Sequence, residues 1–243
     1  MEIGLTGNKG VSPTEEISFD KYFYTVLTPA VVRFNTICFG DFRDFTNEQK
    51  AAAINLQMNI VNEEMVDEYR KYYASDMLEE LDAVADSLFV ISQLMYQLSV
   101  VSELSSDDIS AVDALINQDK LELLLLDYGS FMQTFMTHYD LDVIVEATNR
   151  VIANNEQKFT SDFKLFRAWM SPEGEGLKPS SKVYEGVEYF CLVNETGKIR
   201  KKAGFESVHL QDLVDKQELR YASSELHYTD DATEHGEVNE ETK

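Results

Sequence analysis

The chain has 243 residues, and its formal net charge is -23 because 44 Asp and Glu residues outnumber 21 Lys and Arg residues. This excess argues against recognition of a nucleic-acid backbone, which needs clustered basic residues. A small phosphorylated substrate is still compatible, because metal ions can supply positive charge locally.

Cysteine content and hydropathy indicate the compartment. Cys38 and Cys191 are the two cysteines, and neither belongs to a CxxC motif, which favours a reducing, cytoplasmic setting. The start of the chain has no basic segment followed by an apolar core, and no run of eighteen apolar residues occurs. We therefore expect neither secretion nor a membrane partner.

The first predicted elements are a flexible segment and a helix. Residues 1–20 have a mixed composition and are expected to be flexible. A helix is predicted over residues 27–40, with Pro29 in its first turn and Gly40 at its end.

Two long helices are predicted next. Thr46 and Gln49 fit a capping box that opens the first of them. The chain breaks near residues 74–76, where Ser75 or Asp76 can cap the second helix. Each helix carries a short acidic cluster inside an apolar pattern, and these clusters are the most informative feature of the sequence.

The first cluster occupies residues 62–68. Apolar residues recur around it at spacings of three and four, which predicts a core-facing helix; they are Ile54, Met58, Val61, Met65, Tyr69 and Tyr72. At about 100° per residue, Glu64 and Glu68 flank this stripe on one side. Asp67 lies near the edge of the same side, whereas Glu63 projects away from the stripe.

The second cluster occupies residues 79–86. Glu79, Asp82 and Asp86 share one helix face, while the core stripe consists of Leu81, Ala85, Leu88 and Met95. Asp86 stands in a segment that is apolar on nearly every side, and no Lys or Arg lies within one turn of it. A carboxylate in such surroundings needs a cation, a proton or several hydrogen-bond donors.

Together the clusters predict a site for Mg²⁺ or Mn²⁺ on two packed helices. Carboxylate oxygens without Cys or His favour these hard cations over zinc. The four histidines also lack the spacing of a zinc site; they are His138, His209, His227 and His235. The alternative is a solvated helix face, which stays open for Glu63, Glu79 and Glu80.

The second half of the chain is predicted to be helical before it changes character. A short helix capped near Ser106 precedes an apolar helix over residues 121–136, which is too short to span a membrane. Another helix begins at Asp140 or Leu141 and reaches Ala153.

From residue 158 onward, glycines and prolines predict a loop and then a small hairpin at about residues 183–202. Its first strand is residues 187–193, which turn at residues 194–197 toward Ile199. Residues 218–243 are expected to form a disordered acidic tail. The predicted fold is therefore a mainly α helical bundle over residues 21–217, with this small C-terminal hairpin.

The order of these motifs resembles the all-α nucleoside triphosphate pyrophosphohydrolases, the MazG-like and phosphoribosyl-ATP pyrophosphohydrolase-like superfamily, and especially its phage-type members. The resemblance covers about residues 28–215 and is carried by residues 32–34, 38–40, 60–67, 81–90, 140–142, 154–159 and 197–202. Position 67 is Asp where relatives carry Glu, so either Asp67 or Glu68 is the ligand there. Position 83 is Ala where many relatives carry Glu, so Asp82 is taken as the substitute. Residues 100–137 resemble an insertion.

The resemblance implies an all-α NTP pyrophosphatase fold, a homodimer or homotetramer, and Mg²⁺-dependent cleavage of a (d)NTP to (d)NMP and pyrophosphate. The implied metal ligands are Glu64, Asp67 or Glu68, Asp82 and Asp86. Glu63 or Glu79 would accept the proton of the attacking water. Asn155, Lys158 and Lys201 would contact the substrate, although a plain helix end and a solvated hairpin would equally explain these three.

Three further alternatives stay open. Tyr69, Tyr72, Tyr73 and Trp169 are candidates for stacking on a base or are simply core aromatics. The substrate could be another pyrophosphate-containing nucleotide, such as a phosphoribosyl adduct or an alarmone. A non-enzymatic acidic helical interaction protein would also carry such a surface.

Overall fold

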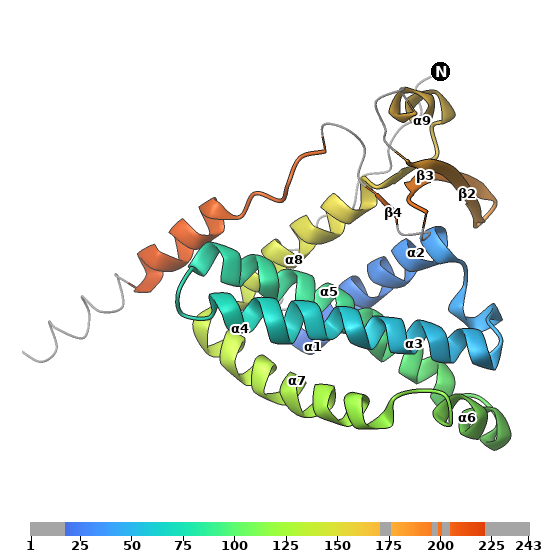
Figure 1. Cartoon of the computed structure of the whole chain (residues 1–243). Coiled ribbons are helices and arrows are strands. Elements are labelled where there is room, and N and C mark those ends of the chain that lie inside the picture. The colour runs from blue at the N-terminus through green and yellow to red at the C-terminus, as the bar shows by residue number, and fades with distance from the viewer. Residues whose placement is uncertain (1–17, 171–175, 196–198, 201–204, 222–243) are drawn as a thin grey trace, which may run out of the picture.

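The computed structural model describes residues 18–170, 176–195, 199–200 and 205–221. It is mainly helical with a small antiparallel sheet, as the sequence predicts (Figure 1). The elements are α1 (Phe19–Tyr22), η1 (Phe23–Leu27), α2 (Thr28–Phe39), η2 (Phe42–Asp44), α3 (Asn47–Val61), η3 (Asn62–Glu68), α4 (Tyr69–Tyr72), α5 (Met77–Ser102), α6 (Ser106–Asp113), α7 (Gln118–His138), α8 (Leu141–Glu156), β1 (Phe159–Thr160), α9 (Phe163–Trp169), β2 (Lys178–Tyr184), β3 (Val187–Val193) and β4 (Ile199–Arg200). A further helix covers residues 211–221.

The predicted pair of long helices forms the centre of the bundle. The capping box at the start of α3 is confirmed, because Gln49 N–H donates to Thr46 Oγ1 at 3.3 Å and Thr46 N–H donates to Gln49 Oε1 at 2.9 Å. Asp76, rather than Ser75, caps α5 by accepting from the backbone N–H groups of Leu78 and Glu79. The helical run from α3 to α4 then packs back along α5 (Figure 1).

Helix α5 is the main core helix and contacts α2, α3, η3, α4 and α8. It is the one described helix that is long and apolar enough to cross a bilayer, but 61% of its most apolar window is buried inside the protein. Leu81, Val84 and Leu88 have no exposed surface. Burial against neighbouring helices explains this apolar composition, as in the core of a bundle.

The acidic segment of residues 62–68 is a π-helix, η3, and not the α-helix that the sequence predicts. In a π-helix each N–H bonds the carbonyl five residues earlier, so the angle between successive side chains is smaller than in an α-helix. The 100° spacing used to place Glu63, Glu64 and Glu68 therefore does not apply here. Met65 still reaches the core and is 2% exposed.

The segment at residues 100–137 forms the two expected helices, α6 and α7. Ser105, one residue before the expected position, caps α6 by accepting from Asp108 N–H. Helix α7 packs along α3 and η3 and buries three side chains in the shared core; they are Leu124, Phe131 and Phe135. This segment is therefore part of the main core.

The sheet is larger than the predicted hairpin. β3 pairs antiparallel with β2 along one edge and with β1 and β4 along the other. The main hairpin turns at Glu185 and Gly186, whose φ values are 50° and 78°, a two-residue turn that suits the strand twist. β2 was predicted as loop, and Pro179 fits in it because β2 is an edge strand.

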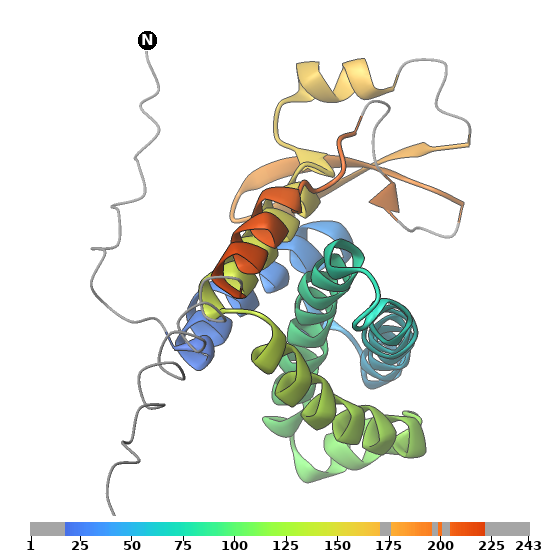
Figure 2. The ribbon, with the colours of Figure 1, turned by 90° about the vertical axis from the view of Figure 1, so that its left-hand side faces the viewer.

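The helix at residues 211–221 lies along α8 (Figure 2). Its apolar side is buried through Leu213 and Val214, and Arg150 of α8 makes a two-bond ion pair with Asp212. Residues 218–221, which the sequence placed in the disordered tail, are helical. Residues 222–243 and 1–17 lie outside the described part, so the predictions made for them stay predictions.

Candidate metal and nucleotide site

A cavity of about 460 Å³ opens between α2, the turn after it, the α3–η3 run, α5 and the end of α8. This volume falls in the range of small-molecule sites. The lining side chains are acidic, amide, aromatic and basic, and those used below are Glu63, Glu64, Asp86, Gln57, Gln93, Gln97, Phe34, Phe42, Phe45, Phe89, Asn155 and Lys158.

The acidic end of the cavity consists of Glu63 and Glu64 from η3 and Asp86 from α5. These residues meet because the run after α3 and the start of α5 are antiparallel neighbours. Burial, followed by the negative charges of Asp86, Glu68, Glu63 and Asp82, raises the pKa of Glu64 to about 8. Four carboxylates from both predicted clusters therefore lie close enough to act on one side chain.

The other predicted acidic residues lie outside the cavity lining. Asp67 is exposed and accepts a hydrogen bond from Asn62 Nδ2 at 3.1 Å, and Glu68 is also exposed. Asp82 is half-buried. Glu79 is exposed in the first turn of α5. Glu63, which α-helical spacing placed away from the core stripe, lines the cavity on the same helix face as Leu56 and Ile60, seven and three residues before it.

The basic side of the cavity is the end of α8. Asn155 is buried, donates to Val151 O at 3.1 Å, and accepts a hydrogen bond from Lys158 Nζ. Lys158 Nζ also lies 5.8 Å from the centre of the Phe34 ring. The structure thus brings two of the three predicted substrate-binding residues to the cavity, while Lys201 lies outside the described residues.

The far end of the cavity was not predicted from the sequence. We call it the amide end, and it consists of Gln93 and Gln97 of α5, Gln57 of α3, and the rings of Phe42 and Phe45. The two rings are held in place by the buried Lys50, whose Nζ donates to the carbonyl oxygens of Arg43 and Phe45. One signal was present, because Gln93 and Gln97 lie seven and eleven residues after Asp86 and so share its helix face.

The four aromatic residues predicted as candidates for stacking on a base make contacts elsewhere in the protein. Tyr69 packs edge-on against Phe131 at 5.0 Å between ring centres, and Trp169 packs against Phe166. Tyr73 stacks on His138 at 4.9 Å. Tyr72 lies beneath Lys71 Nζ, 4.3 Å from its ring centre. None of the four lines the cavity.

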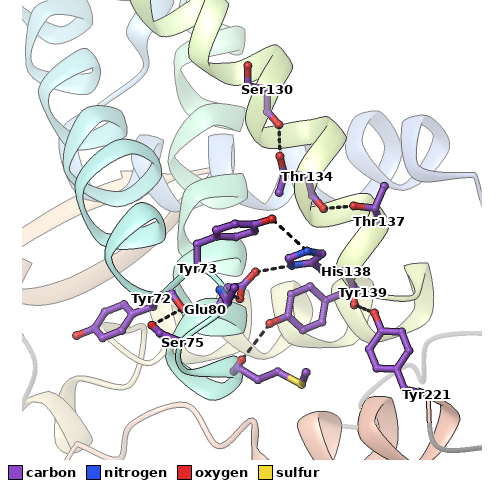
Figure 3. A network of polar contacts seen from close by, with 12 residues as sticks. Tyr72, Tyr73, Ser75, Glu80, Ser130, Thr134, Thr137, His138, Tyr139 and Tyr221 are labelled. Carbon is purple, nitrogen blue, oxygen red and sulfur yellow. Dashed lines mark hydrogen bonds and ion pairs between the residues drawn. The ribbon is translucent and has the colours of Figure 1, made fainter.

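Glu80, which stayed open as a solvated residue, is 3% exposed and belongs to a separate polar network (Figure 3). Its carboxylate accepts from Ala74 N–H at 3.0 Å and pairs with His138 Nδ1 at 3.1 Å. Tyr73 Oη lies 3.3 Å from His138 Nε2. A neutral His138 with its proton on Nδ1 satisfies both contacts, since Nε2 then accepts from Tyr73.

The acidic end fits a hard cation by its chemistry. Among the residues that the structure describes, no three His, Cys, Asp or Glu side chains converge as a ready-made ligand group. The donor set is nevertheless all oxygen. Burial and then repulsion from nearby carboxylates raise the pKa of Glu64, and a divalent ion would relieve both effects.

Comparisons with known proteins add no relative. Searches against family models, curated proteins and solved structures each found no match for this chain.

Proposed function

We propose that this chain is a magnesium-dependent nucleoside triphosphate pyrophosphohydrolase, a phage-type member of the MazG-like all-α superfamily. The observation that carries the proposal is the Glu64 carboxylate, which lines a ligand-sized cavity with its pKa raised to about 8 by burial and by four other carboxylates. Such a group calls for a cation, and Asn155 and Lys158 line the same cavity.

Glu64 and Asp86 are the proposed principal ligands of Mg²⁺ or Mn²⁺, because both line the cavity. Glu68 and Asp82, which act on Glu64 through their charges, complete the set. We favour Glu68 over Asp67, since the charge of Glu68 is among those that raise the pKa of Glu64, whereas Asp67 accepts a hydrogen bond from Asn62. When bound, the metal would neutralise phosphate oxygens and lower the pKa of a ligated water.

The chain's own groups supply the remaining roles. Glu63 lines the cavity next to Glu64 and would accept the proton of the water that attacks the α-phosphorus. As the new phosphorus–oxygen bond forms, the bond to the bridging oxygen breaks, and pyrophosphate leaves with its electron pair. We favour Glu63 over Glu79, which lies outside the lining. Lys158, bonded to Asn155, would bind a phosphate oxygen.

A metal titration combined with a substrate panel tests this function. Saturating Mg²⁺ or Mn²⁺ should raise the thermal midpoint of the wild type, by about 2.7 kcal/mol of stability at 100 times the Kd. Asp86→Asn and Glu64→Gln should lose this shift, while Glu122→Gln, an exposed position on α7, should keep it. Pyrophosphate release is then measured with the common dNTPs and NTPs. If the protein shows no residue-specific metal shift and releases no pyrophosphate, the acidic interaction protein becomes the better explanation.

The proposed oligomer is a homodimer or homotetramer in the cytoplasm. Helix α7 supports this, because Leu123 and Leu126 on it are 62% and 73% exposed, a costly arrangement for a monomer. Light scattering of the wild type and of Leu126→Glu should show a multiple of the chain mass only for the wild type. A monomeric wild type would contradict the proposal.

A further inference from the structure

The two glutamines at the amide end have buried oxygen atoms with no hydrogen-bond partner. Gln93 and Gln97 are 5% and 4% exposed, and the Oε1 atom of each is buried and unpaired. Both residues line the cavity. An unpaired buried acceptor costs about 1–3 kcal/mol, so such atoms in a folded protein call for an explanation.

The neighbouring Gln57 shows that a glutamine side chain in this region can form a hydrogen bond with the protein backbone. Its Nε2 donates to the carbonyl oxygen of Val90 at 2.8 Å. Gln93 and Gln97 line the same end of the cavity, and their carbonyl oxygens are buried without such a partner. Because they are four residues apart on one helix, the two oxygens lie one above the other on the same face.

The distance between the two ends of the cavity suits a nucleotide. At 1.5 Å per residue, Gln93 lies roughly 10 Å and Gln97 roughly 16 Å along α5 from Asp86. Asp86 belongs to the acidic end, where the phosphates are proposed to bind. A nucleotide bound there would extend its base toward the amide end.

The surfaces around the amide end also match a base. Phe42 and Phe45 line it and contact each other with ring centres 5.7 Å apart, and Phe89 lies between the two ends. Aromatic faces accept flat ring systems of any base, so the rings supply affinity without selectivity. Selectivity must come from the polar atoms, and the buried ones without a partner here are two hydrogen-bond acceptors.

We propose that Gln93 and Gln97 select nucleotides whose base carries an exocyclic amino group, as cytosine, adenine and guanine do. Their carbonyl oxygens accept N–H donors of the bound base and exclude bases that present a carbonyl oxygen at the same edge. A site built to pair a polar group discriminates strongly, because the wrong ligand leaves buried atoms unpaired. This inference rests on the proposed function, since it places the phosphates at the acidic end.

Binding of matched nucleotide pairs tests the selection without relying on hydrolysis. The probes are non-hydrolysable α,β-methylene triphosphates of cytidine against uridine and of guanosine against inosine, with Mg²⁺ present, measured by calorimetry. We expect the amino-bearing member of each pair to bind about tenfold more tightly or better. Equal affinity within both pairs would overturn the inference.

Two variants assign the selection to these glutamines. Gln93→Met and Gln97→Met should bring the affinity ratio of each pair close to one. They should also melt at or above the wild-type temperature, because an unpaired buried oxygen is replaced by an apolar group of similar length. The matched control, Gln133→Met at an exposed position of α7, should keep the wild-type ratio.

The outcomes separate this inference from the proposed function. An unchanged ratio in both cavity variants overturns the role of the glutamines, even if the wild type hydrolyses triphosphates. Selective binding without pyrophosphate release supports the glutamine role and contradicts the hydrolase. If none of the four probes binds, both ideas fail.

Discussion

Glu64 and Glu80 are two acidic side chains on adjoining helical segments that meet opposite surroundings. Glu80 is almost fully buried, yet its oxygens face a backbone N–H and the His138 ring (Figure 3). Glu64 is less buried, but the charges that act on it are all negative, and its pKa is raised to about 8. The difference shows that a buried carboxylate with partners can serve the fold, whereas burial among like charges makes Glu64 a candidate for binding a ligand.

The largest expected effect on stability comes from removing the carboxylate of Glu80, which has hydrogen-bond partners. Glu80→Ala leaves Ala74 N–H and His138 without their acceptor in a buried position, so we expect a loss of about 3 kcal/mol in the free energy of unfolding. Urea unfolding measures it, with exposed Glu122→Ala as control. A loss no larger than that of the control would contradict the structural role of Glu80.

Replacement of the Glu64 carboxylate is expected to change stability in the opposite direction. In chelator-treated protein at pH 8, Glu64→Gln removes a charge that its neighbours repel, so the variant should be more stable than the wild type, by about 1 kcal/mol. With saturating Mg²⁺ the order should reverse, because only the wild type binds the ion tightly. Lower stability of the metal-free variant would contradict the like-charge account.

The pH dependence of stability gives a further test of the surroundings of Glu64. Because the pKa of Glu64 is raised in the folded state, the native protein holds a proton that the unfolded chain releases. The contribution of Glu64 to stability is therefore complete below about pH 4 and is lost as the pH rises through about 8. Metal-free thermal midpoints between pH 5 and pH 8 should fall more steeply in the wild type than in Glu64→Gln. Parallel curves would count against this assignment.

The smallest effect is expected at an exposed, paired carboxylate. Arg220 and then Lys216 donate hydrogen bonds to Asp142 and hold its pKa well below the usual range. This stability is present above about pH 4 and is lost as the pH falls through the lowered value. Asp142→Asn should cost about 0.5 kcal/mol at pH 7, and less in 1 M salt. Urea unfolding at both salt concentrations measures this, and a salt-independent cost would argue against an ion pair.

Local signals in the sequence predicted much of the bundle. The Thr46 capping box and the spacing of core residues around Met58 and Leu88 act within one helix, so they are readable from the chain itself. Strand β2 was missed, because an exposed edge strand carries no apolar alternation. Its signal was the turn at Glu185–Gly186.

The sequence predicted the part of the candidate site that consists of charged residues and their neighbours, but not the rest. The acidic residues and Asn155 with Lys158 stand out by type, whereas Gln93 and Gln97 are neutral residues whose meaning depends on being buried without partners. Glu79 and Glu80 look alike in sequence. The backbone N–H of Ala74 and the ring of His138, 58 residues later in the chain, both contact Glu80, and the second of these contacts cannot be read from local sequence. Similarly, no local sequence pattern predicted the π-helix.

That π-helix also limits how this protein can change during evolution. Residues 47–72 form one continuous helical run in which η3 spaces its residues more tightly than the flanking α-helices do. Losing one residue between Glu64 and Tyr69 would let the run close into a regular α-helix with both ends nearly in register, because four α-helical steps turn about as far as five π-helical steps. Single-residue deletions should therefore be tolerated better in η3 than in α3 or α5, where one lost residue turns every later side chain by about 100°.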